Sequence, residues 1–550
     1  LPLLGSRLLA GHDVTTYLAY AAQGAALVRE GAFLPAWGAD LNGGFGGPGL
    51  LLYPPLVNVP HVLLLLAGLP PAVGTGLAAV VLLALSGLAV LGWLRAEGLG
   101  GGALPAALVY VLSPYRLVDV YERSALSENL AFLFPPLVLW ALAASRPLTP
   151  ARRVVVVALP VAGLLLSNLP AAVLFGSVLA AAVLHPATGG GRRGVAVAGA
   201  LLGAGLAAFA LLPAAFSSRW CATELFYSGS SRHFRPSRHV LFGPAELNPE
   251  FGRSVSWAVV ALAMLAFAAY VLGRRGPDRR QPLWAAVALV AFLAMLPPAG
   301  RLWDSLPLLS RLQFPWRLAT VLTLALAALL AFVPRRLSLS VAAVAALLAL
   351  PWWGRSVSPI RDLPVAPAAA SAPGSAFPDP TLVHDAAGFS PNPWVRNPIL
   401  LDPWFVPRTV SPAFWRALLA SARGAPTQSL PQGPVASPSG PVSARVRRWG
   451  PLSGLVEVES TGGRLLLHQL AFPGLHVAVD GTARPTGPDE GTGLLSFDVP
   501  PGRREISWRW EPFPFLRRAR TVSALAAAVA VVLLVLPALR SASSRAPRRS

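Results

Sequence analysis

Long apolar runs recur along most of the chain and dominate its pattern of hydrophobic and polar positions. The clearest runs cover residues 72–94, 101–116, 129–145, 153–169, 170–186, 194–216, 255–273, 282–299, 318–333, 337–353 and 521–539. Each is close to the ~20 apolar residues that a helix needs to cross a bilayer. The pattern predicts an all-α polytopic membrane bundle over residues 1–353 and a last transmembrane helix over 521–539.

The stretch 50–69 is apolar but does not read as an ordinary span. It is interrupted by Pro54, Pro55, Asn58, Pro60 and His61. We interpret it as a helix that lies in the outer membrane interface. With this stretch left out of the spans, most arginine-bearing loops fall on one side of the membrane, which the positive-inside rule identifies as the cytoplasm. The tail 540–550 joins that side, and a first loop, 11–49, faces outward. Arg517, Arg518 and Arg520 depart from the rule, because they lie just outside the last span.

A large outward insert separates the last two predicted spans. Residues 354–450 are rich in Pro and Ala and predict an irregular segment. Residues 451–512 instead alternate apolar and polar positions, for example in Glu505-Ile506-Ser507-Trp508, with turn signals such as Asp480-Gly481 between the runs. This alternation predicts a small extracytoplasmic β-sandwich-like domain.

Composition supports a membrane protein and excludes several other classes. Hydrophobic residues make up 54% of the 550 residues and charged residues 13%, with a mean hydropathy of +0.57. Soluble proteins carry roughly 25% charged residues, so an ordinary soluble enzyme, a disordered chain and a coiled coil are excluded. The net charge of +21 is explained by arginines in short loops rather than by nucleic-acid binding. Cys221 is the single cysteine, which excludes an intramolecular disulfide and a cysteine zinc site.

The first polar cluster lies near the start of the chain, at Gly11-His12-Asp13. An Asp beside a membrane helix can act as a general base toward a hydroxyl, and the alternative is a helix N-cap. Only ten residues precede the cluster, so we expect that an initial membrane helix is missing from the sequence. The glycine run 43–47 matches no phosphate-binding motif and predicts a flexible loop.

The second cluster places charges between two apolar spans, at Arg116, Glu122, Arg123 and Glu128. Such charges are costly unless they face a wet cavity or a ligand. Glu122 suits a sugar hydroxyl or a divalent cation, and Arg123 suits a phosphate. Glu128 has a structural alternative, because a carboxylate also stabilises the start of a helix.

The third cluster ends with Trp316-Arg317 at the outer end of a span. The guanidinium of Arg317 needs an anionic partner at that depth, either an ordinary lipid headgroup phosphate or a substrate phosphate. The spans themselves hold almost no ionisable residues. Because ion-coupled transporters usually need charges near the bilayer midplane, this argues against that class.

The order of several motifs resembles known bacterial membrane proteins. The motifs EGAFLPAW, GGFGGPGLLLYPPL, SPYRLVDVYERSALSE and LQFPWRL, in that order, resemble the six-pyruvoyl-tetrahydropterin-synthase-related membrane proteins. The C-terminal FPGLHVAVDGTARP and FDVPPGRREISWRWEP, followed by a span, resemble YfhO-type membrane proteins. Both groups look like members of the GT-C glycosyltransferase superfamily. The sequence shows no histidine triad for pterin chemistry.

The resemblance implies transfer of a sugar from a polyprenyl-phosphate donor to an extracytoplasmic glycan or lipid acceptor, with inversion, at the bacterial cytoplasmic membrane. In that superfamily an acid of the first outer loop is catalytic, and Asp13 occupies that place, whereas Glu122 or Glu128 matches an acid of the second. The expected catalytic residues are Asp13, Glu122 and Glu128, and the expected substrate-binding residues are His12, Trp37, Tyr53, Arg116, Arg123 and Arg317. The resemblance implies no definite cofactor, and use of a divalent cation stays open. The alternatives are a flippase for a lipid-linked glycan and a non-catalytic envelope assembly protein.

Overall fold

The structure is a computed structural model, and it describes most of the chain. The described residues are 13–32, 35–42, 44–144, 148–186, 190–222, 235–244, 249–274, 276–350, 405, 407–422, 431, 433–438 and 440–543. His12 and most of the predicted irregular segment therefore lie outside the described residues.

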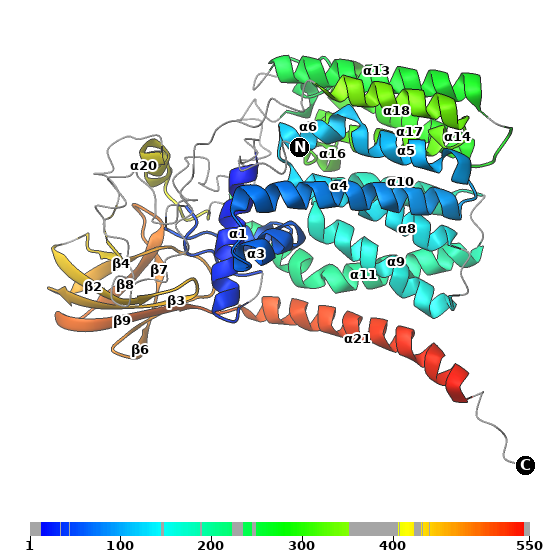
Figure 1. Ribbon diagram of the computed structural model, residues 1–550. Helices are drawn as coiled ribbons and strands as arrows, with labels where there is room; N and C mark the ends of the chain where they lie inside the picture. Colours follow the sequence, from blue (N-terminus) through cyan, green and yellow to red (C-terminus); the bar gives the residue numbers. More distant parts are fainter. Residues whose placement is uncertain are drawn as a thin grey trace, which may run out of the picture.

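Apolar helices running roughly side by side form the larger part of the molecule (Figure 1). They are α4 (Pro71–Ala96), α5 (Gly100–Leu112), α7 (Leu126–Ala131), α8 (Phe134–Ala143), α9 (Pro150–Ser167), α10 (Leu169–Leu184), α11 (Gly190–Ser217), α13 (Pro249–Gly273), α14 (Gln281–Ala294), α17 (Leu318–Leu330), α18 (Arg335–Ala349) and α21 (Pro514–Ser543). Each predicted span overlaps one or two of these helices, but 101–116 runs beyond α5, 282–299 runs beyond α14, and the end of 337–353 lies outside the described residues.

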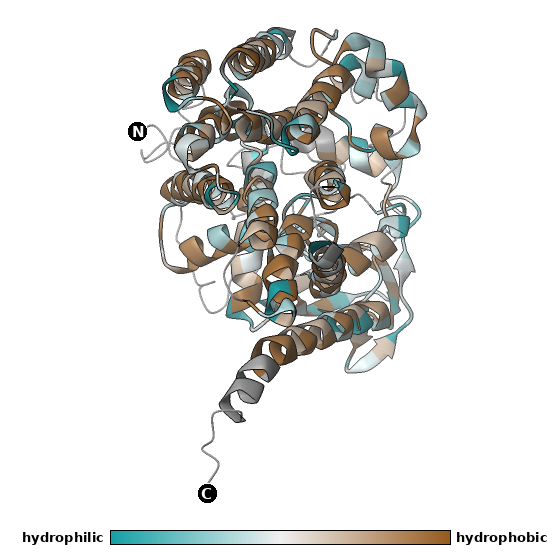
Figure 2. Ribbon diagram, turned by 90° about the vertical axis from the view of Figure 1, so that its right-hand side faces the viewer, coloured by the Kyte–Doolittle hydropathy of each residue, from teal (hydrophilic) through white to brown (hydrophobic). Residues whose placement is uncertain are grey.

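Within the described residues, six helical segments are long and apolar enough to cross a membrane, or up to eight when two bent pairs each count as one span. The chain is a multi-pass membrane protein. Hydrophobic residues predominate on these helices, most of which Figure 2 shows end-on. The last span, Pro514–Val535, lies at the periphery, with only 11% of its most apolar window buried. Its exposed apolar side chains suit contact with lipid.

The arginine-bearing loops gather at the end of the bundle that lies away from the β domain (Figure 1). There the Arg280 guanidinium donates to the Glu97 carbonyl at 2.9 Å, and the Arg152 Nε donates to the Leu534 carbonyl at 3.2 Å. These contacts join the turn before α14 to the end of α4 and the first turn of α9 to α21. Which side of the membrane this end faces stays a prediction.

Short elements cover the opposite end of the bundle. Helix α1 (Val14–Arg29) stands crosswise between the bundle and the β domain (Figure 1). The stretch predicted as one interfacial helix is broken into α2 (Gly49–Leu52), η2 (Pro55–Val57) and α3 (Asn58–Leu66). The break follows from Pro54 and Pro55, which lack the N–H that helix continuation needs.

The predicted loop after α5 is a helix as well. Helix α6 (Pro114–Tyr121) continues from α5 with a bend of 40° at Ser113, whose extended backbone interrupts the helix before Pro114. Helix α6 is entirely buried although its sequence is amphipathic. Its polar residues are therefore enclosed by protein and do not line an exposed loop.

The β domain consists of two antiparallel sheets. One has the strand order β1 (Val435–Ala436), β4 (Gly463–Leu470), β8 (Leu494–Val499), β7 (Gly487–Pro488). The other has the order β2 (Val442–Trp449), β3 (Ser453–Ser460), β9 (Gly502–Trp510), β5 (Leu475–Val479), β6 (Thr482–Arg484). Apolar side chains of both sheets form a core shared with the first loop, including Leu467, Phe497 and Trp508. The expected architecture of helical bundle, β domain and final apolar helix is confirmed.

The β domain begins earlier than the predicted boundary at 451. Strands β1 and β2, and a helix α20 (Pro412–Ala422), lie within the segment 354–450 that was predicted to be irregular. Along the first six residues of β2 exposure alternates, with Val442, Ala444 and Val446 half-buried and the residues between them exposed. The arginines at its exposed positions hide this alternation in a composition-based reading.

Candidate functional site

Buried charges meet at the end of the bundle nearest α1, where α6 turns into α7. Arg123 forms an ion pair with Asp119, one helical turn earlier, and a second one with Glu128 at 3.0 Å. Ser124 adopts a left-handed backbone conformation with φ of 48°, which reverses the chain so that Glu128 returns toward Arg123. The exposed fractions of these side chains are 7% or less, so the ion pairs are shielded from water.

Tyr115 completes the hydrogen bonding of this buried group. Its hydroxyl donates to Glu128 Oε1 at 2.7 Å and accepts from Arg123 Nη1 at 3.1 Å. A buried ion pair is tolerated only when such extra bonds satisfy its remaining polar atoms. One oxygen of Asp119, Oδ2, has no hydrogen-bond partner among the described residues.

Arg317 brings a second cation to Glu128 from a distant segment. It ends the short helix η7 (Pro315–Arg317), and its Nε lies 3.3 Å from Glu128 Oε2. The guanidinium also donates to the Leu312 carbonyl at 3.0 Å and lies 5.0 Å from the Phe314 ring centre. Arg317 is 9% exposed, so its position is fixed by protein contacts.

Asp13 lies at the same end of the bundle. Its backbone N–H donates to the Arg123 carbonyl at 3.0 Å, which ties the start of α1 to the α6–α7 turn. Asp13 occupies the N-cap position of α1, but its side chain makes no capping hydrogen bond. Its charge acts on nearby hydroxyls. Burial first, and then the Asp13 carboxylate, raises the pKa of Tyr53 to about 12.

Hydroxyl groups from three segments form a compact cluster next to these charges. The Tyr17 hydroxyl lies 3.0 Å from the Tyr53 hydroxyl and 2.8 Å from Ser127 Oγ, and Tyr53 lies 3.0 Å from the same Ser127 oxygen. Asn168, at the start of α10, donates its Nδ2 to Ser127 Oγ at 3.0 Å. Burial raises the pKa of Tyr17 well above its ordinary value, so both phenols stay protonated at neutral pH.

Several predicted site residues lie elsewhere. Arg116 is fully buried in the bundle core, where it donates to Ser86 Oγ at 2.9 Å and lies 4.1 Å from the Phe132 ring centre. Trp37 is fully buried against the β domain, and its Nε1 donates to Gln469 at 2.7 Å. Glu122 ends α6 and is partly exposed. The structure thus brings together Asp13, Tyr53, Arg123, Glu128 and Arg317, and it places Arg116 and Trp37 in structural contacts.

Sequence reasoning missed five residues of this site, which are Tyr17, Asp119, Tyr115, Ser127 and Asn168. The spacing of Asp119 and Arg123, four residues apart, was an available signal for an ion pair within a helix. The partners of Ser127 and Asn168 come from other segments, and no local pattern marks them.

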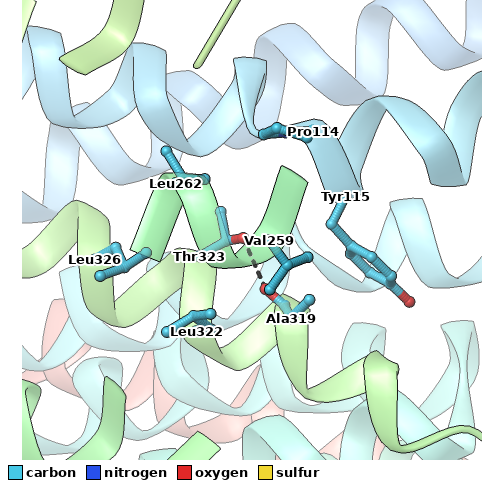
Figure 3. A pocket seen from close by; sticks show the side chains of 8 residues that line it. All are labelled: Pro114, Tyr115, Val259, Leu262, Ala319, Leu322, Thr323 and Leu326. Carbon is cyan, nitrogen blue, oxygen red and sulfur yellow. Dashed lines mark hydrogen bonds between the residues drawn. The ribbon is translucent and has the colours of Figure 1, made fainter. Parts of the chain in front are cut away.

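A small void lies beside Tyr115 of the buried charge cluster, and it is too small to hold a large ligand. Eight residues of α6, α13 and α17 line it, as Figure 3 shows: Pro114, Tyr115, Val259, Leu262, Ala319, Leu322, Thr323 and Leu326. Its volume is about 10 Å³, enough for one water molecule. The Tyr115 hydroxyl points away from the other lining side chains in this view, and Thr323 donates to the Ala319 carbonyl.

The donor set formed by the described residues does not fit a divalent cation. Among the described residues, no three His, Cys, Asp or Glu side chains gather within reach of one ion. The carboxylates that do meet, Asp119 and Glu128, share the guanidinium of Arg123, whose positive charge repels a cation.

The sequence matches no protein-family model and none of the curated proteins. Among solved structures, the chain is similar to the arabinofuranosyltransferase AftD from Mycobacteria, with 21% identity over 65% of this chain and a TM-score of 0.37. A structure of a mutant of that protein gives 21% identity over 65% and a TM-score of 0.36. The matched region spans about a quarter of each of those chains, 25% and 26%. At this identity and TM-score, the likeness carries no inference about activity.

Proposed function

We propose that the chain is a membrane glycosyltransferase of GT-C type, which moves a sugar from a polyprenyl-phosphate donor to a glycan or lipid acceptor outside the cytoplasmic membrane of a bacterium. The supporting observation is the convergence of a carboxylate, two tyrosine hydroxyls and two guanidinium groups at one end of the bundle. These groups come from α1, from the turn after α2, from the α6–α7 turn and from η7. A purely structural bundle needs no such gathering of polar groups.

Asp13 is the proposed general base. Its carboxylate takes the proton of the acceptor hydroxyl as that oxygen attacks the anomeric carbon. The bond between the anomeric carbon and the phosphate oxygen breaks, and the lipid phosphate leaves with the electron pair. The transition state has oxocarbenium character, and a single displacement inverts the anomeric centre. The protonated hydroxyls of Tyr17 and Tyr53 supply hydrogen bonds beside the reacting sugar.

The guanidinium groups have different proposed roles. Arg123 already pairs with Asp119 and Glu128, so we assign it to holding these carboxylates and the backbone of Asp13. Among the described residues Arg317 pairs with one carboxylate, Glu128, and it is the better candidate to stabilise the charge that develops on the leaving phosphate. Glu128 then positions Arg317 and is not itself the base. Glu122, which follows α6 and is partly exposed, is the candidate to bind a hydroxyl of the sugar or acceptor.

Replacement of Asp13 by Asn tests the proposal. We expect sugar transfer from a panel of polyprenyl-phosphate sugars, assayed in membranes, to fall by about 100-fold or more, since general base catalysis contributes roughly that factor. Glu30→Gln is the matched control, because Glu30 follows the other end of α1, and this variant should keep its activity.

Unchanged transfer by Asp13→Asn at normal expression would remove the base from the proposal. The flippase alternative has its own outcome. Proteoliposomes containing the wild-type chain would then move the lipid-linked sugar between leaflets without transferring the sugar to an acceptor.

A further inference from the structure

The glycine-rich part of the first loop, predicted to be flexible, is a folded unit. This glycine loop comprises residues 35–48, of which residue 43 lies outside the described residues. Gly38 and Gly47 exchange backbone hydrogen bonds at 3.0 and 2.9 Å, as two short antiparallel strands would. Asn42 adopts a left-handed conformation with φ of 55° and donates its side-chain amide to the Gly46 carbonyl at 2.9 Å. The loop therefore has one defined shape.

A bulge in strand β4 of the β domain binds this loop. Strand β4 pairs with β8 at Leu467 opposite Leu495 and at Leu470 opposite Leu494, so His468 and Gln469 have no partners in β8. A bulge releases side chains from the regular alternation of the sheet. The released Gln469 is fully buried.

Every hydrogen-bonding group of the Gln469 amide is used. Its Oε1 accepts from Trp37 Nε1 at 2.7 Å. Its Nε2 donates to the Gly44 carbonyl at 3.0 Å, to the Ala39 carbonyl at 3.2 Å and to its own neighbour, the His468 carbonyl, at 2.8 Å. A buried amide that loses such partners leaves unsatisfied polar atoms, which is costly.

The residues on either side of Gln469 make further contacts with the glycine loop. The Leu470 N–H donates to the Phe45 carbonyl at 2.6 Å, and the His468 ring stacks on the Phe45 ring with 3.8 Å between centres. Trp37 stacks on Phe472 with 5.3 Å between ring centres. Three consecutive residues of the bulge region thus bind both sides of the glycine loop.

The loop in turn joins the two tyrosines of the site. It follows α1, which carries Tyr17, and leads through α2 to Tyr53. The backbone N–H of Asp40 donates to Gln23 of α1 at 2.9 Å, which fastens the loop to that helix as well. A displacement of the loop would move Tyr53 relative to Tyr17 and Ser127, whose hydroxyls lie within 3.0 Å of one another.

We propose that Gln469 is a positioning residue: by seating the glycine loop on the β4 bulge, the β domain fixes Tyr53 at the buried hydroxyl cluster. For its effect on catalysis this inference rests on the proposed transferase function, whereas the seating itself does not. The β domain thereby acts on the site from a position 432 residues after Trp37 in the chain.

Two glycines with the same backbone angle give a matched test. Gly46 and Gly68 both have φ of +78°, so alanine meets a left-handed backbone at each. A Cβ on Gly46 would lie 2.5 Å from Gln469 Oε1 and 2.5 Å from the Trp37 ring, whereas a Cβ on Gly68 would meet nothing within 4 Å. Only Gly46→Ala should therefore unseat the loop.

A second pair of variants acts from the side of the β domain. Gln469→Leu keeps the side-chain volume but removes the bonds to the loop. Ser496→Ala is its control, since Ser496 is also buried, and its hydroxyl donates within the β domain, to the Gly487 carbonyl at 3.0 Å.

The readouts are amide hydrogen exchange and transfer kinetics of the full chain in detergent or nanodiscs. We expect Gly46→Ala and Gln469→Leu to raise exchange at least tenfold over residues 35–57, with no change in β3, β9 or α4, and to lower kcat by about tenfold or more with little change in the donor KM. Combining Gln469→Leu with Trp37→Phe should cost less than the sum of the two changes, because they remove the same bond.

Unchanged exchange over residues 35–57 in both variants would overturn the seating. Raised exchange with wild-type kcat would overturn the link to catalysis. Failure of the proposed function has a different signature, in which Asp13→Asn transfers as well as the wild type or the wild type transfers nothing. In that event, the inference is tested by exchange alone: raised exchange over residues 49–57 in the two variants would support an effect of Gln469 on the position of Tyr53, and unchanged exchange there would contradict it.

Discussion

At the scale of single residues, the neighbours of each carboxyl decide its state. Asp119 and Glu128 are buried together, and each would repel the charge of the other without Arg123 between them. Among the described residues, no cation pairs with Asp40. Burial first, and then the charge of Glu30, raises the pKa of Asp40 to about 6. Aspartates in this chain are therefore buried in two different settings, Asp119 paired with a guanidinium and Asp40 near a second carboxylate.

Asp40→Asn should remove a pH dependence of stability. The Asp40 pKa is higher in the folded chain, about 6, than in the unfolded chain, so the folded chain holds the extra proton and its stability falls as pH rises from about 4 to 6. The asparagine variant should be more stable than the wild type above pH 6, by no more than about 3 kcal/mol, and equal to it near pH 4. The hydrogen bonds of Asp40 to Gln23 and Gly44 use the backbone and remain.

Thermal unfolding in detergent from pH 4 to pH 8 measures this difference. A constant difference between the variant and the wild type across that range would show that Asp40 does not titrate there.

At the scale of elements, close approach of helices depends on single glycines. Helix α5 passes so near the end of α17 that a Cβ on Gly102 would lie 2.3 Å from the Ala331 carbonyl oxygen, which is backbone and cannot move aside alone. Gly101, its neighbour, faces open space. The contact between Gly102 and Ala331 fixes α5 against α17. Because α6 continues from α5, the contact also fixes the start of α6.

Gly102→Ala should destabilise the bundle by about 1–3 kcal/mol, the usual effect of overpacking a close contact. Gly101→Ala should leave stability unchanged or raise it by up to about 1 kcal/mol, because alanine favours the helix. Melting temperatures of the two variants in the same detergent provide the comparison. Equal melting temperatures would mean that α5 and α17 are less close than the distance requires.

The sequence allowed prediction of the apolar helices, because a bilayer imposes a composition that a single segment reveals. It did not show which of them are long enough to span, since six to eight of the eleven predicted spans meet that length among the described residues. It also identified Asp13, Arg123, Glu128 and Arg317 as unusual, since charges beside apolar runs need a reason. Their partners were not predictable. Asp119 and Arg123 neutralise each other across one turn, so a segment that appeared to be a wet loop folds as buried helix α6.

The glycine loop shows the same limit. Its composition is typical of a flexible segment, and its order comes from Gln469, whose bulged position follows from strand pairing far along the chain. Arg116 was expected to bind substrate, but the bend at Ser113 places it among Ser86, Asn129 and Phe132. No local pattern reports which way a helix turns after a bend.

At the scale of the whole molecule, the arginine-rich end and the β domain lie at opposite ends of the bundle (Figure 1). With Cys221 replaced by alanine, a cysteine at exposed Arg95 should react with a membrane-impermeant maleimide only after the cells are opened. A cysteine at exposed Ser443 in β2 should react in intact spheroplasts. Labelling of both positions from the same side would contradict the proposed topology.

The connection between β9 and α21 sets a limit on movement of the β domain. Glu511, Pro512 and Phe513 alone separate Trp510 from Pro514. Even fully stretched, three residues reach only about 10 Å. The sheet is therefore held close to the N-terminal end of α21. A larger movement of the β domain would require either unwinding of the first turn of α21 or separation of β9 from its neighbours β3 and β5. So short a connection allows the β domain to tilt on the bundle more readily than to separate from it.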